Sequence, residues 1–126
     1  MNENELSKLI VECAIEVHRN LGGPGLLESV YEEALVWEIK HRNVFLERQL
    51  TVPIIYKNTT LASPLRLDIL VDKKVIIEVK SVTQYNPIFE AQILTYLRMM
   101  DLKLGLVINF GEHLVKDGIH RVVNGL

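Results

Sequence analysis

The sequence predicts an α/β domain in which helices pack on one mixed β-sheet. Three features indicate this class. Apolar residues near the start of the chain recur at steps of three and four, the period changes to two from Val44, and residues 104–110 form a continuous apolar run. The chain has 126 residues, of which 48% are hydrophobic, so we expect a single domain over residues 1–126 with a core of its own.

Two helices are predicted before the first strand. The first carries an amphipathic apolar stripe that stops at the glycine-rich stretch 22–25 and consists of Leu6, Leu9, Ile10, Cys13, Ala14, Val17 and Leu21. The second should run from about Leu26 to Arg42. Cys13 is the single cysteine, so we expect a buried side chain and a reducing, cytoplasmic setting rather than a disulfide.

Alternating apolar residues from Val44 to Tyr56 predict a half-buried strand, in which Pro53 indicates an edge or a bulge. The elements after it are a turn at 57–59, a strand ending at Val71, a strand from Val75 to about Ser81, a helix after Asn86-Pro87, a buried strand over 104–110 and a last short strand over 119–123.

The charge of the chain limits the classes of partner. The formal net charge is −2, so a generic polyanion binder is excluded, and contact with nucleic acid would need a local basic patch or a metal bridge. The first residues lack the basic-then-apolar pattern of a signal peptide. No apolar run approaches the roughly 18 residues of a membrane span, so we expect no membrane segment.

Two acids and a lysine stand out in an aliphatic, strand-like stretch. Asp68 is followed ten residues later by Glu78-Val79-Lys80. A hairpin centred on Lys73 would place Asp68 opposite Glu78 and Arg66 opposite Lys80. These four side chains would then share one face of the sheet, and the aliphatic residues of both strands, from Leu65 through Leu67 to Val79, would occupy the other face.

Two interpretations of this polar group remain open. Opposed carboxylates raise each other's pKa unless a cation lies between them, and a small set of hard oxygen ligands suits Mg²⁺ or Mn²⁺. Lys80 would then polarise a water or neutralise an oxyanion, which suits hydrolysis of a phosphodiester. The alternative is an ion network on an exposed face, in which Arg66 and Lys80 pair with the two acids.

Two further polar residues lie beside apolar helix stripes. Glu28, one turn before Tyr31, would either reach the polar group as a third acid or compensate the charge of a helix N-terminus. Gln92 lies on the apolar side of its helix, where a buried amide would bond to the carboxylates, to a phosphate or to a neighbouring backbone group. His18 indicates a structural role, and Lys40-His41-Arg42 indicates a solvated helix end or a phosphate contact.

The order of these elements resembles the PD-(D/E)XK nuclease superfamily: helix, strand with Asp68, strand with Glu78-Val79-Lys80, and helix with Gln92. Within it, Gly25-Leu-Leu-Glu28-Ser-Val-Tyr31 looks like the motif that names the GxxExxY family. Three other segments are similar to that family, namely Val17–Gly22, Ala91–Leu97 and Leu106–Gly111. Leu67 stands where the superfamily motif has its proline, and the glycine turn over 21–25 is one residue longer than usual.

The resemblance implies a restriction-endonuclease-like core, a mixed central sheet flanked by helices. Asp68 and Glu78 would be metal ligands, joined by the carbonyl of Val79. Lys80 would be the catalytic lysine, Glu28 the helix-borne acid, and Gln92 the polar residue of the following helix.

Three hypotheses follow. The first is an Mg²⁺- or Mn²⁺-dependent nuclease acting on DNA or RNA, with a homodimer as a compatible state because many nucleases act in pairs. The second is a nuclease-fold module that binds nucleic acid or a protein without cleaving it. The third is a small structural domain whose polar group is an ion network, with Glu28 and Gln92 far from Asp68.

Overall fold

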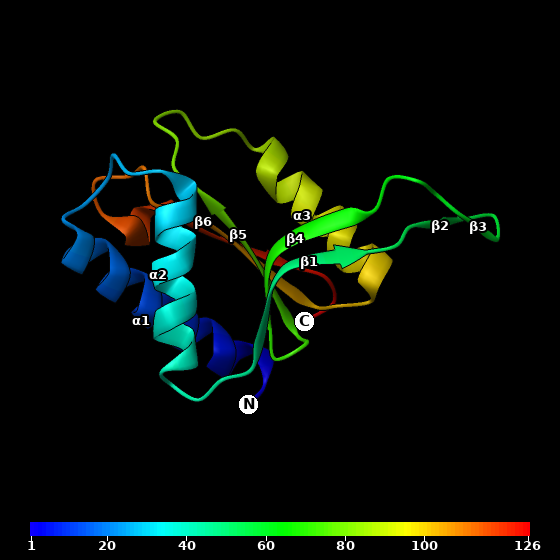
Figure 1. Cartoon of the computed structure of the whole chain (residues 1–126), viewed down its shortest axis with the longest axis horizontal. Helices are drawn as coiled ribbons and strands as arrows, with labels where there is room; N and C mark the ends of the chain where they lie inside the picture. Colours follow the sequence, from blue (N-terminus) through cyan, green and yellow to red (C-terminus); the bar gives the residue numbers. More distant parts are fainter.

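A computed structural model describes all residues from Met1 to Leu126 (Figure 1). Its elements in chain order are α1 (Glu3–Leu21), α2 (Glu28–Lys40), β1 (Leu46–Val52), β2 (Ile55–Tyr56), β3 (Thr59–Thr60), β4 (Leu65–Val71), β5 (Val75–Lys80), α3 (Ile88–Met100), β6 (Leu104–Asn109), the 3-10 helix η1 (Val115–Gly118) and β7 (Ile119–Val123).

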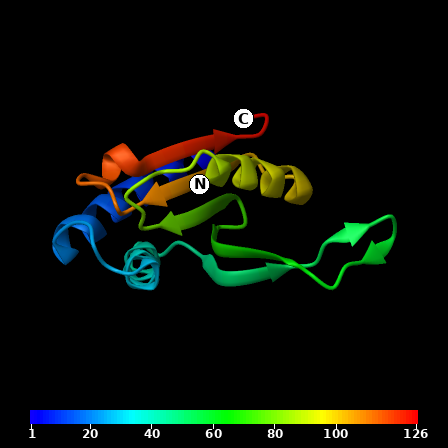
Figure 2. The ribbon, with the colours of Figure 1, turned by 90° about the horizontal axis from the view of Figure 1, so that it is seen from above.

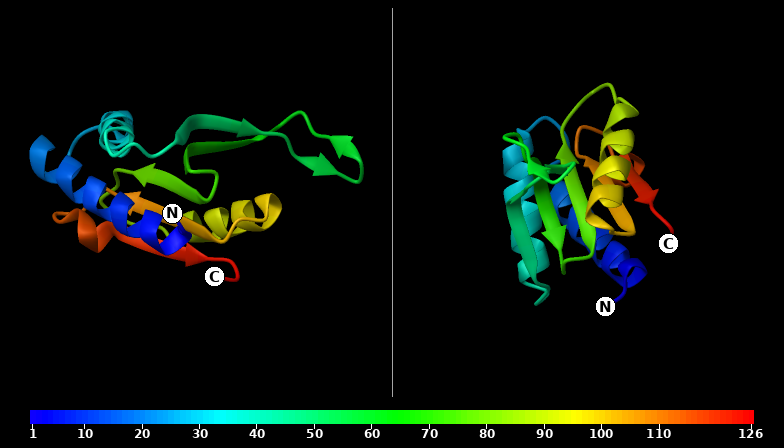
Figure 3. Two further views of the ribbon diagram at one scale, coloured as in Figure 1. Left: turned by 90° about the horizontal axis from the view of Figure 1, so that it is seen from below. Right: turned by 90° about the vertical axis from the view of Figure 1, so that its right-hand side faces the viewer.

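Five strands form one mixed sheet in the order β1-β4-β5-β6-β7. The β5–β6 pair is parallel, and the other neighbours are antiparallel. Helices α1 and α2 cover one face and α3 covers the other, as the right-hand view of Figure 3 shows. The predicted α/β class, a restriction-endonuclease-like mixed sheet flanked by helices, is confirmed. No helix is long and apolar enough to cross a membrane.

Local sequence explains where the first two helices begin and end. Asn2 and Glu5 form a capping box at the start of α1, and Gly22 ends the helix with a φ of 92°. Helix α2 is shorter than predicted because Gly25 has a φ of 109° and Leu27 is extended. Cys13 is fully buried on the α1 stripe, as predicted, and burial raises its pKa to about 11.

The register predicted for the β4–β5 hairpin is confirmed where its ladder is formed. Ile69 pairs with Ile77 and Val71 with Val75, around a turn in which Asp72 and Lys73 have φ values of 50° and 55°. The single strand predicted from Val44 to Tyr56 is wrong. It divides at Pro53 into β1, which is an edge strand, and β2, which pairs with β3 in a separate hairpin.

The two sides of the sheet hold separate apolar clusters, and β4 changes sides at Asp68. Ile69 and Val71 pack under α1 and α2, whereas Leu67 packs in the cluster under α3. Gln49 in β1, beside this position, has a φ of 51°. The prediction that Leu67 and Ile69 share one aliphatic face is therefore wrong, because both strands of the ribbon bend where Gln49 and Asp68 meet.

Candidate functional site

Asp68 lies where β4 and β5 separate. The ladder between these strands ends at the Ile69–Ile77 pair, one step before Asp68 and Glu78. The Asp68 side chain takes over the bonding there, since its Oδ2 accepts a hydrogen bond of 2.8 Å from the backbone N–H of Val79. A backbone donor of β5 thus fixes the orientation of this half-buried carboxylate.

Glu78 is the buried carboxylate of the site. Its side chain lies on the α3 side of the sheet, only 7% of the residue is exposed, and its Oε1 has no hydrogen-bond partner. Burial, and then the negative charge of Asp68, raise its pKa to about 8 against an opposing effect of Lys80. A cation beside Asp68 and Glu78 would supply the missing partner and favour the ionised form.

Helix α3 forms the other wall of the site. The Lys80 ammonium lies 4.4 Å from the centre of the Phe89 ring, which holds it beside this helix. Burial, followed by the negative charges of Glu78 and Asp68, raises the pKa of the Tyr96 hydroxyl. Sequence reasoning missed Tyr96 as a candidate site residue, although the polar end of its ring was a usable signal.

Gln92 differs from its predicted setting. The residue is exposed, and its Nε2 donates a 2.8 Å hydrogen bond to the hydroxyl of Tyr96. The prediction of a buried amide bonded to the carboxylates or to the backbone is wrong. One helical turn separates the two side chains, which explains the contact, and Gln92 reaches the carboxylates only through Tyr96.

Glu28 is exposed at the first position of α2 and does not meet the two sheet acids. It lines a shallow pocket with Leu26, Leu27, Ser29 and Ser81. No group of three or more acidic, histidine or cysteine side chains is arranged to hold a metal ion. The role of Glu28 as a third acid of the sheet group stays a prediction, and its position at the first residue of α2 agrees with charge compensation at a helix N-terminus.

Arg66 does not join the polar group as predicted. After the bend at Asp68, its Nε donates to Gln49 Oε1 at 2.9 Å. Gln49 in turn donates to the carboxylate of Glu32, which also receives Nε of Arg48 at 2.6 Å. None of the four ion pairs in the molecule includes Asp68 or Glu78. The interpretation of the polar group as an exposed ion network is therefore wrong.

The loop before Glu28 is held by Tyr31. The Tyr31 hydroxyl donates to the carbonyl of Gly23 at 2.6 Å and accepts from the N–H of Leu26 at 3.2 Å. The Tyr31 ring stacks on Phe110 at 4.6 Å. Ser81, directly after Lys80, donates to the carbonyl of Leu26 at 2.8 Å, which ties this loop to the end of β5.

Two buried polar residues hold the ends of β5 and β6. Asn109 Oδ1 accepts from the N–H of Val82 at 3.0 Å, and its Nδ2 donates to the carbonyl of the same residue at 3.1 Å. His18 Nε2 donates to the carbonyl of Phe110 at 3.1 Å, which agrees with its predicted structural role. Asn109 was missed, although a polar residue near the end of an apolar run was a usable signal.

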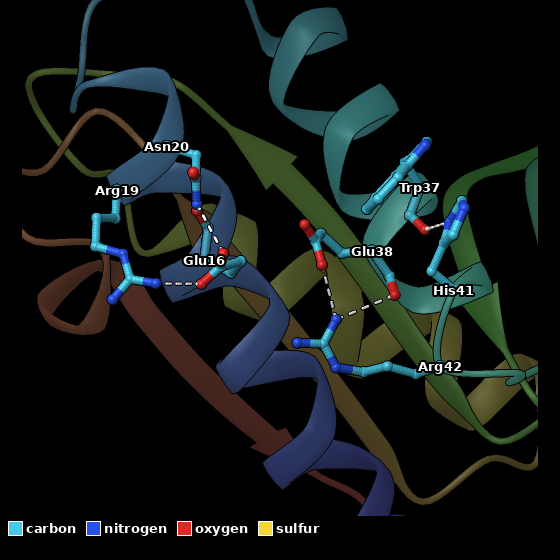
Figure 4. A network of polar contacts seen from close by, with 7 residues as sticks. All are labelled: Glu16, Arg19, Asn20, Trp37, Glu38, His41 and Arg42. Carbon is cyan, nitrogen blue, oxygen red and sulfur yellow. Dashed lines mark hydrogen bonds and ion pairs between the residues drawn. The ribbon is translucent and has the colours of Figure 1, made fainter.

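The basic segment at the end of α2 lies apart from these residues. Arg42 pairs with Glu38 at 2.8 Å, and His41 stacks on Trp37 with ring centres 3.6 Å apart (Figure 4). His41 also donates to the carbonyl of Trp37 at 2.7 Å. These contacts close a helix end, the first of the two interpretations of Lys40-His41-Arg42.

A cavity of about 600 Å³ lies between the end of α1 and residues 113–116. Of the residues discussed above, His18, Gly22 and Gly23 line it, but none of the candidate site residues does. The carboxylate site therefore lies outside this cavity, between β4, β5 and α3, where Asp68 and Lys80 are partly exposed.

Comparison with known proteins places the chain in a family. Residues 4–122 match the family model of the PD-(D/E)XK nuclease superfamily. No curated protein sequence matches. A solved structure, "Crystal structure of SSO0001", is similar with a TM-score of 0.45 and 13% identity over 95% of this chain and 78% of that one. On the family match, the chain belongs to the PD-(D/E)XK nuclease superfamily.

Proposed function

We propose that this PD-(D/E)XK nuclease domain hydrolyses phosphodiester bonds of DNA or RNA with a divalent metal ion. The observation that carries the proposal is the Glu78 carboxyl, which is buried, lacks a partner at Oε1 and lies beside a second carboxylate. Such a pair costs stability unless a cation or a proton compensates it. We also propose that the chain belongs to the narrower GxxExxY family. This rests on the loop before Glu28, in which the Tyr31 hydroxyl bonds to the backbone of Gly23 and Leu26.

The side chains present fit Mg²⁺ or Mn²⁺. Asp68 and Glu78 offer hard oxygen donors, and the carbonyl of Val79, between Glu78 and Lys80, is the third proposed ligand. A metal with few protein ligands keeps waters and takes further oxygens from a phosphate. When bound, it would act as a Lewis acid and lower the pKa of a coordinated water.

The other residues of the site have separate roles in this proposal. Lys80, held against Phe89, places a positive charge where negative charge develops on the attacked phosphate. Gln92 holds the Tyr96 hydroxyl by a hydrogen bond and presents its own amide to solvent, where it can donate to a substrate phosphate. Glu28 lines a shallow pocket with Ser81, which directly follows Lys80, and in this proposal it acts on the substrate from there.

The decisive test is cleavage of labelled DNA and RNA, single-stranded, duplex and branched, with Mg²⁺ or Mn²⁺. Asp68→Asn and Glu78→Gln remove a charge with little change of shape, and both should abolish cleavage. Asp72→Asn is the matched control, because Asp72 lies in the turn between the same two strands and outside the site. Equal residual cleavage by wild type and Glu78→Gln would refute the proposal.

One observation favours a second function, a nuclease-fold module that binds without cleaving. Only two carboxylates meet in the site, and Glu28 does not complete a three-acid cluster. Calorimetry separates the two functions. Heat of Mn²⁺ binding to wild type that disappears in Glu78→Gln supports the nuclease. No heat of binding to wild type at millimolar Mn²⁺ supports the module that binds without cleaving. A homodimer and a cytoplasmic location stay predictions.

A further inference from the structure

The β2–β3 hairpin, with its connections, projects from the body of the protein. We call residues 53–64 the arm. Figures 1 and 2 show it extending beyond α3, away from the other helices, and the left-hand view of Figure 3 agrees. The arm continues the ribbon of β1 and β4, so Asp68 lies on the same strand that leaves its base.

The arm has a defined shape. Ile55 pairs with Thr60, Tyr56 pairs with Thr59, and Leu61 donates to the carbonyl of Ile54 at 2.8 Å. Lys57 and Asn58 form the turn with φ values of 47° and 64°. Positive φ at both central positions is the turn geometry that matches the twist of paired strands. Pro53 and Pro64 stand at the base, where missing N–H groups interrupt the ladder.

The side chains of the arm are unusual for a surface that faces water alone. Ile55 is 67% exposed and Tyr56 is 58% exposed, and no helix covers either. An isolated two-stranded hairpin is marginally stable in water, and this one exposes an apolar side chain on each of its two faces, because Ile55 and Tyr56 are consecutive in β2. The arm therefore has the properties of an element that is completed by a partner.

The arm and the strand residues at its base carry positive and no negative side chains, which indicates an anionic partner. The chain has 16 acidic residues, yet the segment from Leu50 to Leu67 contains none. The same segment carries Lys57 at the tip and Arg66 at the base. Lys57 Nζ lies 5.5 Å from the centre of the Tyr56 ring, so a cation and an aromatic face occur together at the tip.

We propose that the arm binds duplex nucleic acid and sets the position of the duplex relative to Asp68. This inference rests on the proposed nuclease function. The major groove, about 12 Å wide, admits a two-stranded β-ribbon. Ten residues separate Asp68 from Asn58, a reach of at most about 33 Å at roughly 3.3 Å per residue. One turn of DNA is about 34 Å, so the tip meets the duplex up to one turn from the cleaved bond.

The roles within the arm follow from its chemistry. Lys57 and the side chains of Asn58 and Thr59 would contact phosphates, which fix register without reading sequence. Tyr56 and Ile55 would lie against base edges in the major groove, where apolar side chains contact the thymine methyl group. The arm thus adds affinity for long duplexes, and the body of the domain contacts the bond to be cut.

The test compares short and long duplexes with an arm variant. The double variant Tyr56→Thr/Lys57→Asn removes the aromatic ring and the charge, while Thr suits a strand and Asn tolerates the positive φ of the turn. Fluorescence anisotropy in Ca²⁺ measures binding to duplexes of about 8 and about 30 base pairs. The first is shorter and the second is longer than one turn of DNA, which is the distance that the arm can reach. Lys73→Asn, in the β4–β5 turn, is the control for loss of one lysine.

We expect wild type and Lys73→Asn to bind the long duplex at least about tenfold more tightly than the short one, as a few phosphate and apolar contacts would give. The double variant should lose this gain and bind the short duplex normally. An equal loss on both lengths, or no loss, would overturn the inference. So would a wild-type dimer that the double variant converts to a monomer in analytical ultracentrifugation, because the arm would then cover a second copy of the chain.

Cleavage is measured on the same duplexes and keeps the two proposals apart. If binding depends on the arm but neither duplex is cleaved, the proposed nuclease activity is refuted and the proposed role of the arm in duplex binding stands. If wild type and the double variant cleave both lengths equally, the proposed role of the arm is refuted and the proposed nuclease activity stands. Circular dichroism shows whether the double variant is folded, and Lys57→Asn alone gives the same comparison with a smaller change.

Discussion

Replacing Glu78 by glutamine should stabilise the metal-free protein at alkaline pH, although it removes a proposed catalytic group. The pKa of Glu78 is raised from 4.5 to about 8 in the folded chain because the carboxyl is buried beside Asp68. Below pH 4.5 the folded and unfolded states both hold the proton. Between pH 4.5 and 8 the unfolded state releases it and the folded state keeps it, so stability falls as the pH rises.

The size of the loss follows from the shift. The difference between 4.5 and about 8 corresponds to about 5 kcal/mol at about 1.4 kcal/mol per pH unit. Relaxation around the ionised carboxylate reduces this, so we expect wild type to lose about 2–4 kcal/mol between pH 4.5 and pH 9. That is a large share of the roughly 5–15 kcal/mol of a small domain. Glu78→Gln should lack this loss and exceed wild type at pH 9.

The assay is urea unfolding, followed by circular dichroism at several pH values with EDTA present. Glu33→Gln, an exposed position on α2, is the control and should keep the pH dependence of wild type. A Glu78→Gln variant that is less stable than wild type at pH 9, or that retains the full fall with pH, would refute the assignment of a buried, unpaired carboxyl to this position.

Three other predictions follow from the same contacts. Mn²⁺ should raise the free energy of unfolding of wild type more at pH 8 than at pH 6, since binding must displace the proton of Glu78, and should not stabilise Glu78→Gln; stabilisation of both proteins would place the ion elsewhere. Tyr31→Phe leaves the Gly23 carbonyl and the Leu26 N–H without their partner and should cost about 1–3 kcal/mol; hydrogen exchange should quicken more at Leu26 than in the buried strand β6. Gly111→Ala puts a methyl group 2.2 Å from the carbonyl oxygen of Val82 and should cost about 1–3 kcal/mol in urea unfolding; wild-type stability would show that this turn yields freely.

Sequence alone predicted the parts of the fold that depend on local patterns. The β4–β5 register follows from two alternating runs around Lys73, and a shift by one residue would have moved every side chain to the wrong face. The C-terminal end of α1 follows from Gly22, where the apolar stripe stops. These features need no knowledge of the rest of the chain, because the residues that determine them are neighbours.

The arrangement of the site depended on contacts that are distant in sequence. No local signal gives Gln49 its positive φ, and the bend at Asp68 turns Arg66 toward Gln49 instead of toward Lys80. Glu28 and Gln92 were placed by helical spacing, which shows the side of a helix but not its distance from the sheet. The pairing of Asp68 with Glu78 was predictable, and the bond from Val79 to the Asp68 side chain was not.

The bend at Asp68 connects the proposed metal site with the arm. The Asp68 side chain accepts a hydrogen bond from the N–H of Val79 where the β4–β5 ladder ends. From that point the paired strands β1 and β4 lead to the arm. An asparagine keeps an oxygen for this bond and removes the charge, whereas alanine removes both. Asp68→Asn should therefore abolish cleavage and retain the tighter binding of long duplexes, and Asp68→Ala should lose both. If Asp68→Ala binds long duplexes as tightly as Asp68→Asn, the bond to Val79 does not set the direction of the arm.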